Sequence, residues 1–93
     1  MKANDTGMTT IELLYFARLR EVFGREREQL QLPGSIRNVA GLTAWLRGRG
    51  QPWELELAPG KPVRIAVNQD MAGADTPLGD GDEVALFPPV TGG

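Results

Sequence analysis

Residues 35–49 read SIRNVAGLTAWLRGR, and this stretch decides the fold because it carries the main helical periodicity of the chain. Apolar side chains recur at the spacing of one helix face, at Ile36, Val39, Leu42 and Leu46. Ser35 is the predicted N-cap, since its hydroxyl can accept a hydrogen bond from a backbone N–H of the first turn. The pattern therefore predicts one amphipathic helix over 36–49.

This helix needs a partner surface to be stable. Gly41 and Gly48 each weaken a helix by about 1 kcal/mol relative to alanine. Gly50 and Pro52 are the residues expected to end it. We therefore expect the apolar face of the helix to pack against a sheet.

Short runs with the alternation typical of strands surround the helix. The expected strands are 11–17, 28–32, 63–67 and 83–87. Residues 18–23 have room for one short helical turn, with Gly24 as its C-cap. Residues 53–57 fit either a turn of helix or an irregular connection, 68–77 read as a loop, and 78–82 as a dense turn.

The order is strand, short helix, strand, long helix, strand, loop, strand. One helix packed on a small mixed sheet is an α+β domain, with the first and last strands as neighbours in the sheet centre. A ubiquitin-like β-grasp arrangement satisfies this order with every connection short. We expect one domain over 10–89, a disordered leader over 1–9 and a flexible tail over 90–93, with Met8 as an alternative translation start.

The helix can cover only one face of this sheet. If Val84 and Leu86 point into the core with the first strand, then Leu14, Phe16 and Phe87 are left on the other face. Aromatic side chains there need a cover. The cover is either a partner protein, with Arg20 at the rim of the contact, or the loop 68–77 with Met71 folded over them.

Composition excludes several kinds of chemistry. The chain has no cysteine and no histidine, which removes thiolate nucleophiles, histidine-based triads and zinc sites built on sulfur or imidazole. Asp80 and Asp82 form a tight acidic cluster, but Asp-Gly-Asp is also ordinary turn chemistry. We therefore expect no metal site and no intrinsically bound cofactor.

Charge and hydropathy bear on partners and location. The formal net charge is −2, which gives no electrostatic footprint for nucleic acid. Arginines and glutamates interleave between Arg18 and Glu28, as on a solvated face of mixed charge. No apolar run reaches the length of a membrane span, and no signal peptide is present. The default expectation is a soluble cytoplasmic protein that binds neither nucleic acid nor membrane.

The sequence ends in Thr91-Gly92-Gly93 after the last expected strand. Glycines have no Cβ, so such a tail can enter a channel too narrow for side chains. Pro88 and Pro89 favour an extended backbone just upstream. Residues 90–93 could then reach roughly 13 Å, at about 3.3 Å per residue. This pattern favours a carboxylate presented for reaction, although a terminus without function is the simpler interpretation.

Three segments together resemble a known family. Residues 78–93 read LGDGDEVALFPPVTGG, which closely resembles the C-terminus of the molybdopterin synthase small subunits, the MoaD-type sulfur carriers. Residues 14–21, LYFARLRE, resemble the opening of that family, and residues 66–69, AVNQ, resemble its A-V-N strand end. Three features depart from the pattern of that family. These are the polar leader, the glycine-bearing helix, and Leu86, which stands at a position where the family often has an aromatic residue.

The resemblance implies a β-grasp protein whose Gly93 carboxylate is adenylated by a ubiquitin-activating-type adenylyltransferase that uses ATP, and is then converted to a thiocarboxylate by an external sulfur donor. The carrier would dock on the large synthase subunit and give its sulfur to the pterin precursor, building the dithiolene of molybdopterin. Gly92 and Gly93 would be the reacting end. The residues implied at the partner interface are Phe16, Arg20, Met71, Phe87, Pro88, Pro89, Val90 and Thr91.

The composition of the chain is consistent with catalysis by partner proteins. The chain has no thiol, no imidazole base and no phosphate-binding G-x-x-x-x-G-K-[ST] loop. Catalysis would belong to partners, with this chain as a protein-bound cosubstrate. Three alternatives stay open at this point: a thiamine-pathway sulfur carrier, a ubiquitin-like modifier that conjugates to lysines, and an interaction module whose diglycine end is incidental.

Overall fold

The computed structural model describes residues 8–88, which form one five-stranded mixed sheet and three helices. Most of the expected leader and all of the expected tail lie outside the described residues. The elements in chain order are β1 (Thr9–Tyr15), α1 (Arg18–Phe23), β2 (Arg27–Leu32), α2 (Val39–Arg47), α3 (Trp53–Glu56), β3 (Arg64–Val67), β4 (Asp70–Met71) and β5 (Glu83–Phe87).

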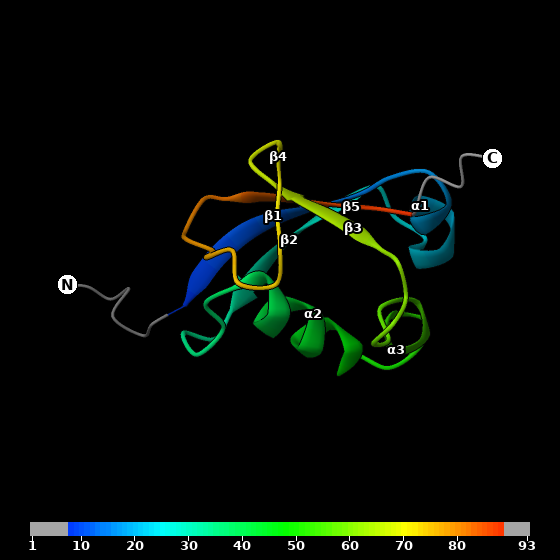
Figure 1. Cartoon of the computed structure of the whole chain (residues 1–93), viewed down its shortest axis with the longest axis horizontal. Helices are drawn as coiled ribbons and strands as arrows, with labels where there is room; N and C mark the ends of the chain where they lie inside the picture. The colour runs from blue at the N-terminus through cyan, green and yellow to red at the C-terminus, as the bar shows by residue number, and fades with distance from the viewer. Residues whose placement is uncertain (1–7, 89–93) are drawn as a thin grey trace.

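The strand order is β2-β1-β5-β3-β4, so the first and last strands are neighbours, as predicted. They run parallel, with Leu13 opposite Val84 and Tyr15 opposite Leu86, and all other strand pairs are antiparallel. Because β1 and β5 are parallel, both end at the same end of the molecule, beside α1 (Figure 1). The predicted α+β class and β-grasp arrangement are confirmed.

The core lies between the sheet and α2. Helix α2 crosses one face, whereas the opposite face carries no helix within the described part (Figure 1). Alternation along the strands sends every second side chain toward the helix. The buried core consists of Ile11, Leu13, Tyr15, Leu19, Phe23, Leu30, Leu32, Val39, Leu42, Leu46, Leu57, Ile65, Val67, Val84 and Leu86.

The main helix begins later than the sequence predicts, and Ser35 is not its cap. Asn38 is the N-cap, and its Oδ1 accepts a hydrogen bond from the N–H of Gly41 at 2.8 Å. The reason lies in a distant loop. The N–H of Leu78 donates to the carbonyl of Arg37 at 2.9 Å, and Asn38 forms an isolated antiparallel bridge with Pro77. These contacts keep the backbone before Val39 out of the helix, which ends at Arg47 and not at Arg49.

The other differences are smaller. Strand β1 ends at Tyr15, because Ala17 has a φ of 53° that breaks the extended backbone. Residues 53–56 form the short helix α3. The expected loop 68–77 contains β4, which two residues of positive φ, Asn68 and Gln69, fold back onto β3. Helix α1 and strand β5 have the predicted bounds, and Gly24 closes α1 at a φ of 73°.

Candidate functional site

The candidate site begins where the two central strands end. Phe16 follows β1 and Phe87 closes β5, and their rings stack with centroids 4.8 Å apart and planes 6° apart. The N–H of Phe16 also donates to the carbonyl of Leu86 at 3.1 Å, which continues the ladder beyond Tyr15. Both side chains are half-buried. The structure therefore brings together two of the predicted site residues and places them on the helix-free face.

An apolar row crosses four of the five strands on this face. The register places Leu14 opposite Ala85, Ala85 opposite Ala66 and Ala66 opposite Met71, with Arg27 at the β2 edge of the row. Directly opposite residues share one face of a sheet. Met71 keeps 62% of its surface exposed and lies at the β4 edge, with β3 between it and Phe87. The loop therefore does not cover the phenylalanines with this methionine, although Ala66 and Ala85 in the middle of the row are themselves buried.

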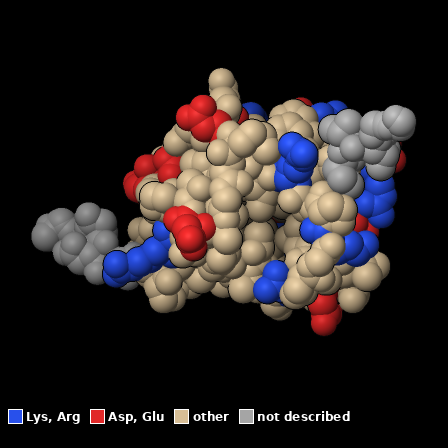
Figure 2. Space-filling model, viewed as in Figure 1, with Lys and Arg blue, Asp and Glu red and all other residues tan. Residues whose placement is uncertain are grey.

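Charge is distributed unevenly around this face. Arg64 lies opposite Phe87 in the register, and Arg20 is exposed on α1 at the same end. Within residues 8–88, neither side chain forms an ion pair. At the other end of the face, Glu12 and Glu83 lie opposite each other. In Figure 2 basic side chains gather near α1 and the end of β5, while acidic side chains are prominent over the other half.

Of the predicted site residues from Pro88 onward, only Pro88 belongs to the part of the chain that the structure describes. Pro88 is described and half-buried, directly after the Phe16–Phe87 stack. Pro89, Val90, Thr91, Gly92 and Gly93 lie outside the described residues. A cleft of about 250 Å³ lies next to Pro88 and is lined by residues of α1, α3 and the segment before β3.

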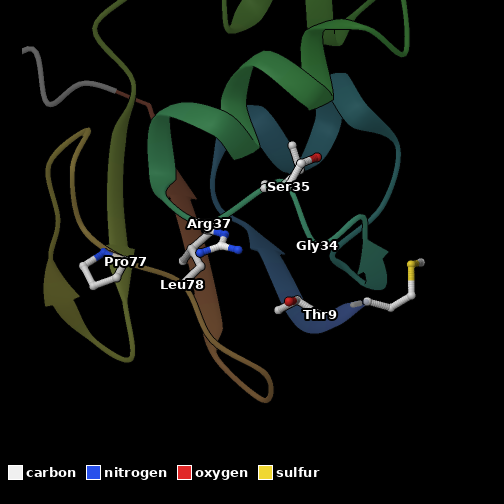
Figure 3. Close-up of a pocket in the computed structure, with 8 residues that line it drawn as sticks. Thr9, Gly34, Ser35, Arg37, Pro77 and Leu78 are labelled. Atoms are coloured by element: carbon white, nitrogen blue, oxygen red, sulfur yellow. The ribbon is translucent and has the colours of Figure 1, made fainter. Parts of the chain in front are cut away.

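A larger hollow of about 690 Å³ lies at the start of β1, where Thr9, Arg37 and Leu78 line it (Figure 3). Strand β1 runs from this hollow to the Phe16–Phe87 stack over 7 residues. At about 3.3 Å per residue the two places are separated by roughly 20 Å. The hollow therefore does not belong to the site at the end of β5.

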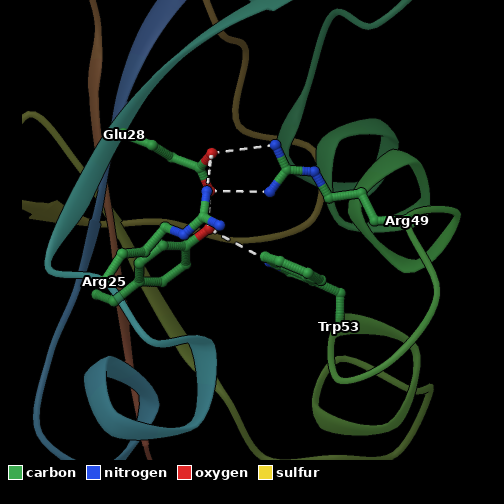
Figure 4. A network of polar contacts seen from close by, with 5 residues as sticks. Arg25, Glu28, Arg49 and Trp53 are labelled. Atoms are coloured by element: carbon green, nitrogen blue, oxygen red, sulfur yellow. Dashed lines mark hydrogen bonds and ion pairs between the residues drawn. The ribbon is translucent and has the colours of Figure 1, made fainter.

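A polar network fixes the helices on the other side of the sheet (Figure 4). Arg49 donates two hydrogen bonds to Glu28, at 2.9 and 3.0 Å, and its guanidinium lies 4.7 Å from the ring centroid of Trp53. The Tyr15 hydroxyl donates to Glu28 and accepts a hydrogen bond from Trp53 Nε1 at 3.3 Å. These contacts join β1 and β2 to α3 and to the segment after α2, so the role of the network is structural.

The ionisation of this network follows from its contacts. Burial alone would raise the pKa of Glu28, but hydrogen bonds from Arg49 and Tyr15 outweigh it and hold the pKa below its usual value. Burial and the hydrogen bond to Glu28 raise the pKa of the Tyr15 hydroxyl. Glu28 is therefore charged and Tyr15 neutral at neutral pH, which is the state in which every member has a partner.

The acidic cluster of the last turn has backbone partners. Asp80 Oδ1 accepts the N–H of Thr10 at 2.7 Å, and Asp82 Oδ2 accepts the N–H of Gly79 at 2.7 Å. Among residues 8–88, no group of three or more metal-ligating acidic, histidine or cysteine side chains is found.

Within the same residues, no helix has the length and apolar character to span a bilayer.

Sequence reasoning missed three charged residues near the exit of β5: Arg18, Glu56 and Arg64. Arg18 and Glu56 are 38 positions apart and meet in an ion pair, with Nη1–Oε1 at 2.8 Å. Arg64 is opposite Phe87 only because of the antiparallel β3–β5 register. The alternation of 63–67 could have shown that Arg64 points away from the core. Its place beside Phe87 could not be predicted, because the β3–β5 register depends on the tertiary fold.

Comparison with known proteins agrees with this architecture. The model of the ThiS family matches residues 13–93. The molybdopterin synthase sulfur carrier subunit of Escherichia coli is 41% identical over 83 residues, which cover 89% of this chain and 99% of that protein.

Two solved structures extend the likeness. A putative molybdopterin converting factor subunit 1 from Pyrococcus furiosus superimposes with a TM-score of 0.72 at 29% identity, covering 88% of this chain and 99% of that chain. A Helicobacter pylori structure, a complex of subunits 1 and 2 of the molybdopterin-converting factor, matches with a TM-score of 0.61 at 27% identity, covering 91% and 100%. The chain therefore belongs to the ThiS family and, within it, to the molybdopterin synthase sulfur carrier subunits.

Proposed function

We propose that this chain is the sulfur carrier subunit of a molybdopterin synthase and that the carboxylate of Gly93 carries the sulfur. The observation that carries the proposal is the chain-long similarity to the Escherichia coli carrier, at 41% identity over 83 residues. The family match also extends to Gly93, so the Gly92-Gly93 pair lies within the matched part.

The chemistry begins with activation of the Gly93 carboxylate. A carboxylate is a poor electrophile because it has no adequate leaving group. An adenylyltransferase partner joins the carboxylate oxygen to the α-phosphorus of ATP and releases pyrophosphate. A donor that delivers the sulfur as hydrosulfide then supplies the nucleophile, which attacks the carbonyl carbon, expels AMP and loses its proton, and this leaves a thiocarboxylate. The sulfur comes from outside, because this chain contains no cysteine.

The open sheet face serves as the docking surface for the large synthase subunit. Phe16, Phe87 and Met71 supply the apolar contacts, and Arg20 supplies a charged contact at the rim. A stacked aromatic pair on an uncovered face is the kind of surface that a partner protein buries. This face ends at Pro88, so docking there brings Pro89, Val90, Thr91, Gly92 and Gly93 to the partner. The partner supplies the catalytic groups, and the sulfur passes from Gly93 to the pterin precursor.

Intact-mass measurement tests the function directly. The protein is incubated with ATP, an adenylyltransferase of this type and a sulfur donor. The expected result is a mass gain that corresponds to the exchange of one oxygen for sulfur, located at Gly93 by fragmentation. An unchanged mass, under conditions where the Escherichia coli carrier is converted, would overturn the proposal.

Complementation separates the synthase from the thiamine pathway. The curated relative favours molybdenum cofactor synthesis. We therefore expect the gene to restore a molybdoenzyme activity in a strain that lacks its own synthase carrier. Restoration of growth only in a strain that lacks the thiamine-pathway carrier would assign the chain to that pathway instead.

A further inference from the structure

The cleft beside Pro88 is formed by three parts of the chain that are distant in the sequence: α1, residues 56–63 and Pro88. Arg18 comes from the start of α1, Glu56 from the end of α3, Lys61 and Pro62 from the segment before β3, and Pro88 from the end of β5. Its volume of about 250 Å³ lies below the roughly 300–1,000 Å³ of most small-molecule sites. The cleft therefore suits a single side chain better than a metabolite.

In this cleft the negative charge of Glu56 is neutralised by Arg18. Arg18 Nη1 and Nη2 donate to the two oxygens of Glu56 at 2.8 and 2.9 Å. The hydrogen bond from Arg18 is the main cause of the lowered pKa of Glu56, so this carboxylate is ionised at neutral pH. The Glu56 side chain is only 8% exposed, against 59% for Arg18. Both carboxylate oxygens are engaged, while the Arg18 side chain stays mostly exposed.

Lys61 leaves the cleft with an excess positive charge. Its side chain forms no ion pair within residues 8–88, and Glu56 is the single acidic residue that lines the cleft in this part of the chain. The backbone of Lys61 is fixed on both sides, since its N–H donates to Ala58 at 3.0 Å and its carbonyl accepts from Val63 at 2.9 Å. Pro62 restricts the backbone between these bonds. The backbone that carries the Lys61 side chain is therefore held in a preorganised turn.

We propose that this cleft receives an aspartate or glutamate side chain of the protein that accepts the tail, held by Lys61 and by the exposed edge of Arg18. The inference deepens the proposed function and rests on it. Two observations support it: the cleft includes Pro88, the residue directly after Phe87 at the end of β5, and its net charge is complementary to a carboxylate. Contacts of this kind orient a partner and raise its specificity. The partner would then be locked at the point where the tail leaves the domain.

Affinity measurements with the large synthase subunit test whether the positive charge of Lys61 contributes to binding. Lys61 is exposed, so its variants should fold, and equal melting temperatures check this. We expect Lys61→Glu to weaken binding about tenfold or more, and Lys61→Met, which keeps an apolar stem, to weaken it less. The matched control is Arg37→Glu, an exposed arginine at the opposite end of β1 that lines the other hollow, and its affinity should change less than about twofold.

Carbodiimide coupling tests the identity of the bound group. This reagent joins an amine to a carboxylate in direct contact, and the chain has two lysines, Lys2 and Lys61. We expect an intermolecular cross-link between Lys61 and one acidic residue of the large subunit. Lys61→Arg should keep the affinity and lose that cross-link, because arginine retains the charge but does not form the amide.

The outcomes separate the two proposals. If the wild-type protein neither binds the large subunit nor becomes a thiocarboxylate, the proposed function fails. If the wild-type protein binds, but Lys61→Glu binds as Arg37→Glu does, the inference about the cleft is wrong and the function stands. Tighter binding of Lys61→Glu would also overturn it, because the occupant would then be basic.

Discussion

Phe16 and Phe87 stack with their ring planes 6° apart, although 71 positions separate them in the sequence. The parallel pairing of β1 with β5 produces this contact, because it ends the two strands side by side. The pair lies on the face that α2 does not cover, directly before Pro88. We expect an aromatic pair in this place to contribute more to recognition than to the core.

Phe87→Ala should therefore affect binding more than stability. We expect the free energy of unfolding to fall by about 1–2 kcal/mol, since the variant loses a ring stack and only part of a buried surface. Binding to the large subunit should weaken by about 2 kcal/mol or more, as at interface hot spots. Urea denaturation and calorimetric titration measure the two quantities.

Phe23→Ala is the matched control, because Phe23 is 5% exposed and belongs to the core. Truncating a buried phenylalanine costs about 3–5 kcal/mol. If Phe87→Ala costs as much as Phe23→Ala in stability and leaves binding unchanged, the assignment of the open face is wrong.

Removing Gly93 should separate function from folding. The core of the described chain ends at Leu86, so we expect the melting temperature to stay nearly unchanged. Sulfur transfer to the pterin precursor should be abolished, because the carboxylate then resides on Gly92 and no longer reaches the same position. A normal transfer rate in a reconstituted synthase assay would contradict the role of Gly93.

The sequence predicted the elements whose signals are local. Helix α1 and strand β5 have their predicted bounds, because Gly24 can adopt a left-handed backbone and because 83–87 is a short, mostly apolar run between a glycine- and aspartate-rich turn and Pro88. The β-grasp order followed from the succession of elements. The residues on the open face followed from the two-residue period, once the core face was assigned.

Features set by distant contacts could not be predicted in this way. Both Ser35 and Asn38 are good cap residues, and the contacts of Arg37 and Asn38 with Leu78 and Pro77 decide between them. The cleft at Pro88 is lined by the ion pair between Arg18 and Glu56, two residues that no spacing rule connects.

Glu28→Gln should change the dependence of stability on pH. The pKa of Glu28 is lower in the folded protein than in the unfolded chain, so its contribution is fully present above the unfolded value of about 4.3 and is lost as pH falls through the folded value. At pH 7 the variant should lose about 1.5–3 kcal/mol, as for hydrogen bonds to a charged group. The difference from wild type should shrink below about pH 4, as measured by urea denaturation at several pH values.

Glu12→Gln is the control for this experiment. Glu12 pairs with Arg27 at 3.5 Å, and the two side chains are 38% and 62% exposed. Exposed pairs contribute about 0–1 kcal/mol. An equal loss in both variants at pH 7, or a loss in Glu28→Gln that persists undiminished at low pH, would show that the charge of Glu28 does not stabilise the network.

Asn38→Ala tests where the main helix begins. The side chain of Asn38 accepts the N–H of Gly41 at 2.8 Å, and loss of such a cap costs about 0.5–2 kcal/mol. Ser35→Ala is the matched control, because Ser35 is exposed and lies before the helix, so its stability should change by less than about 0.5 kcal/mol. Chemical denaturation of both variants decides between the two caps. If Ser35→Ala proves the more costly change, the helix begins at Ile36 in solution, and the loop contacts of Arg37 and Asn38 are not what sets its start.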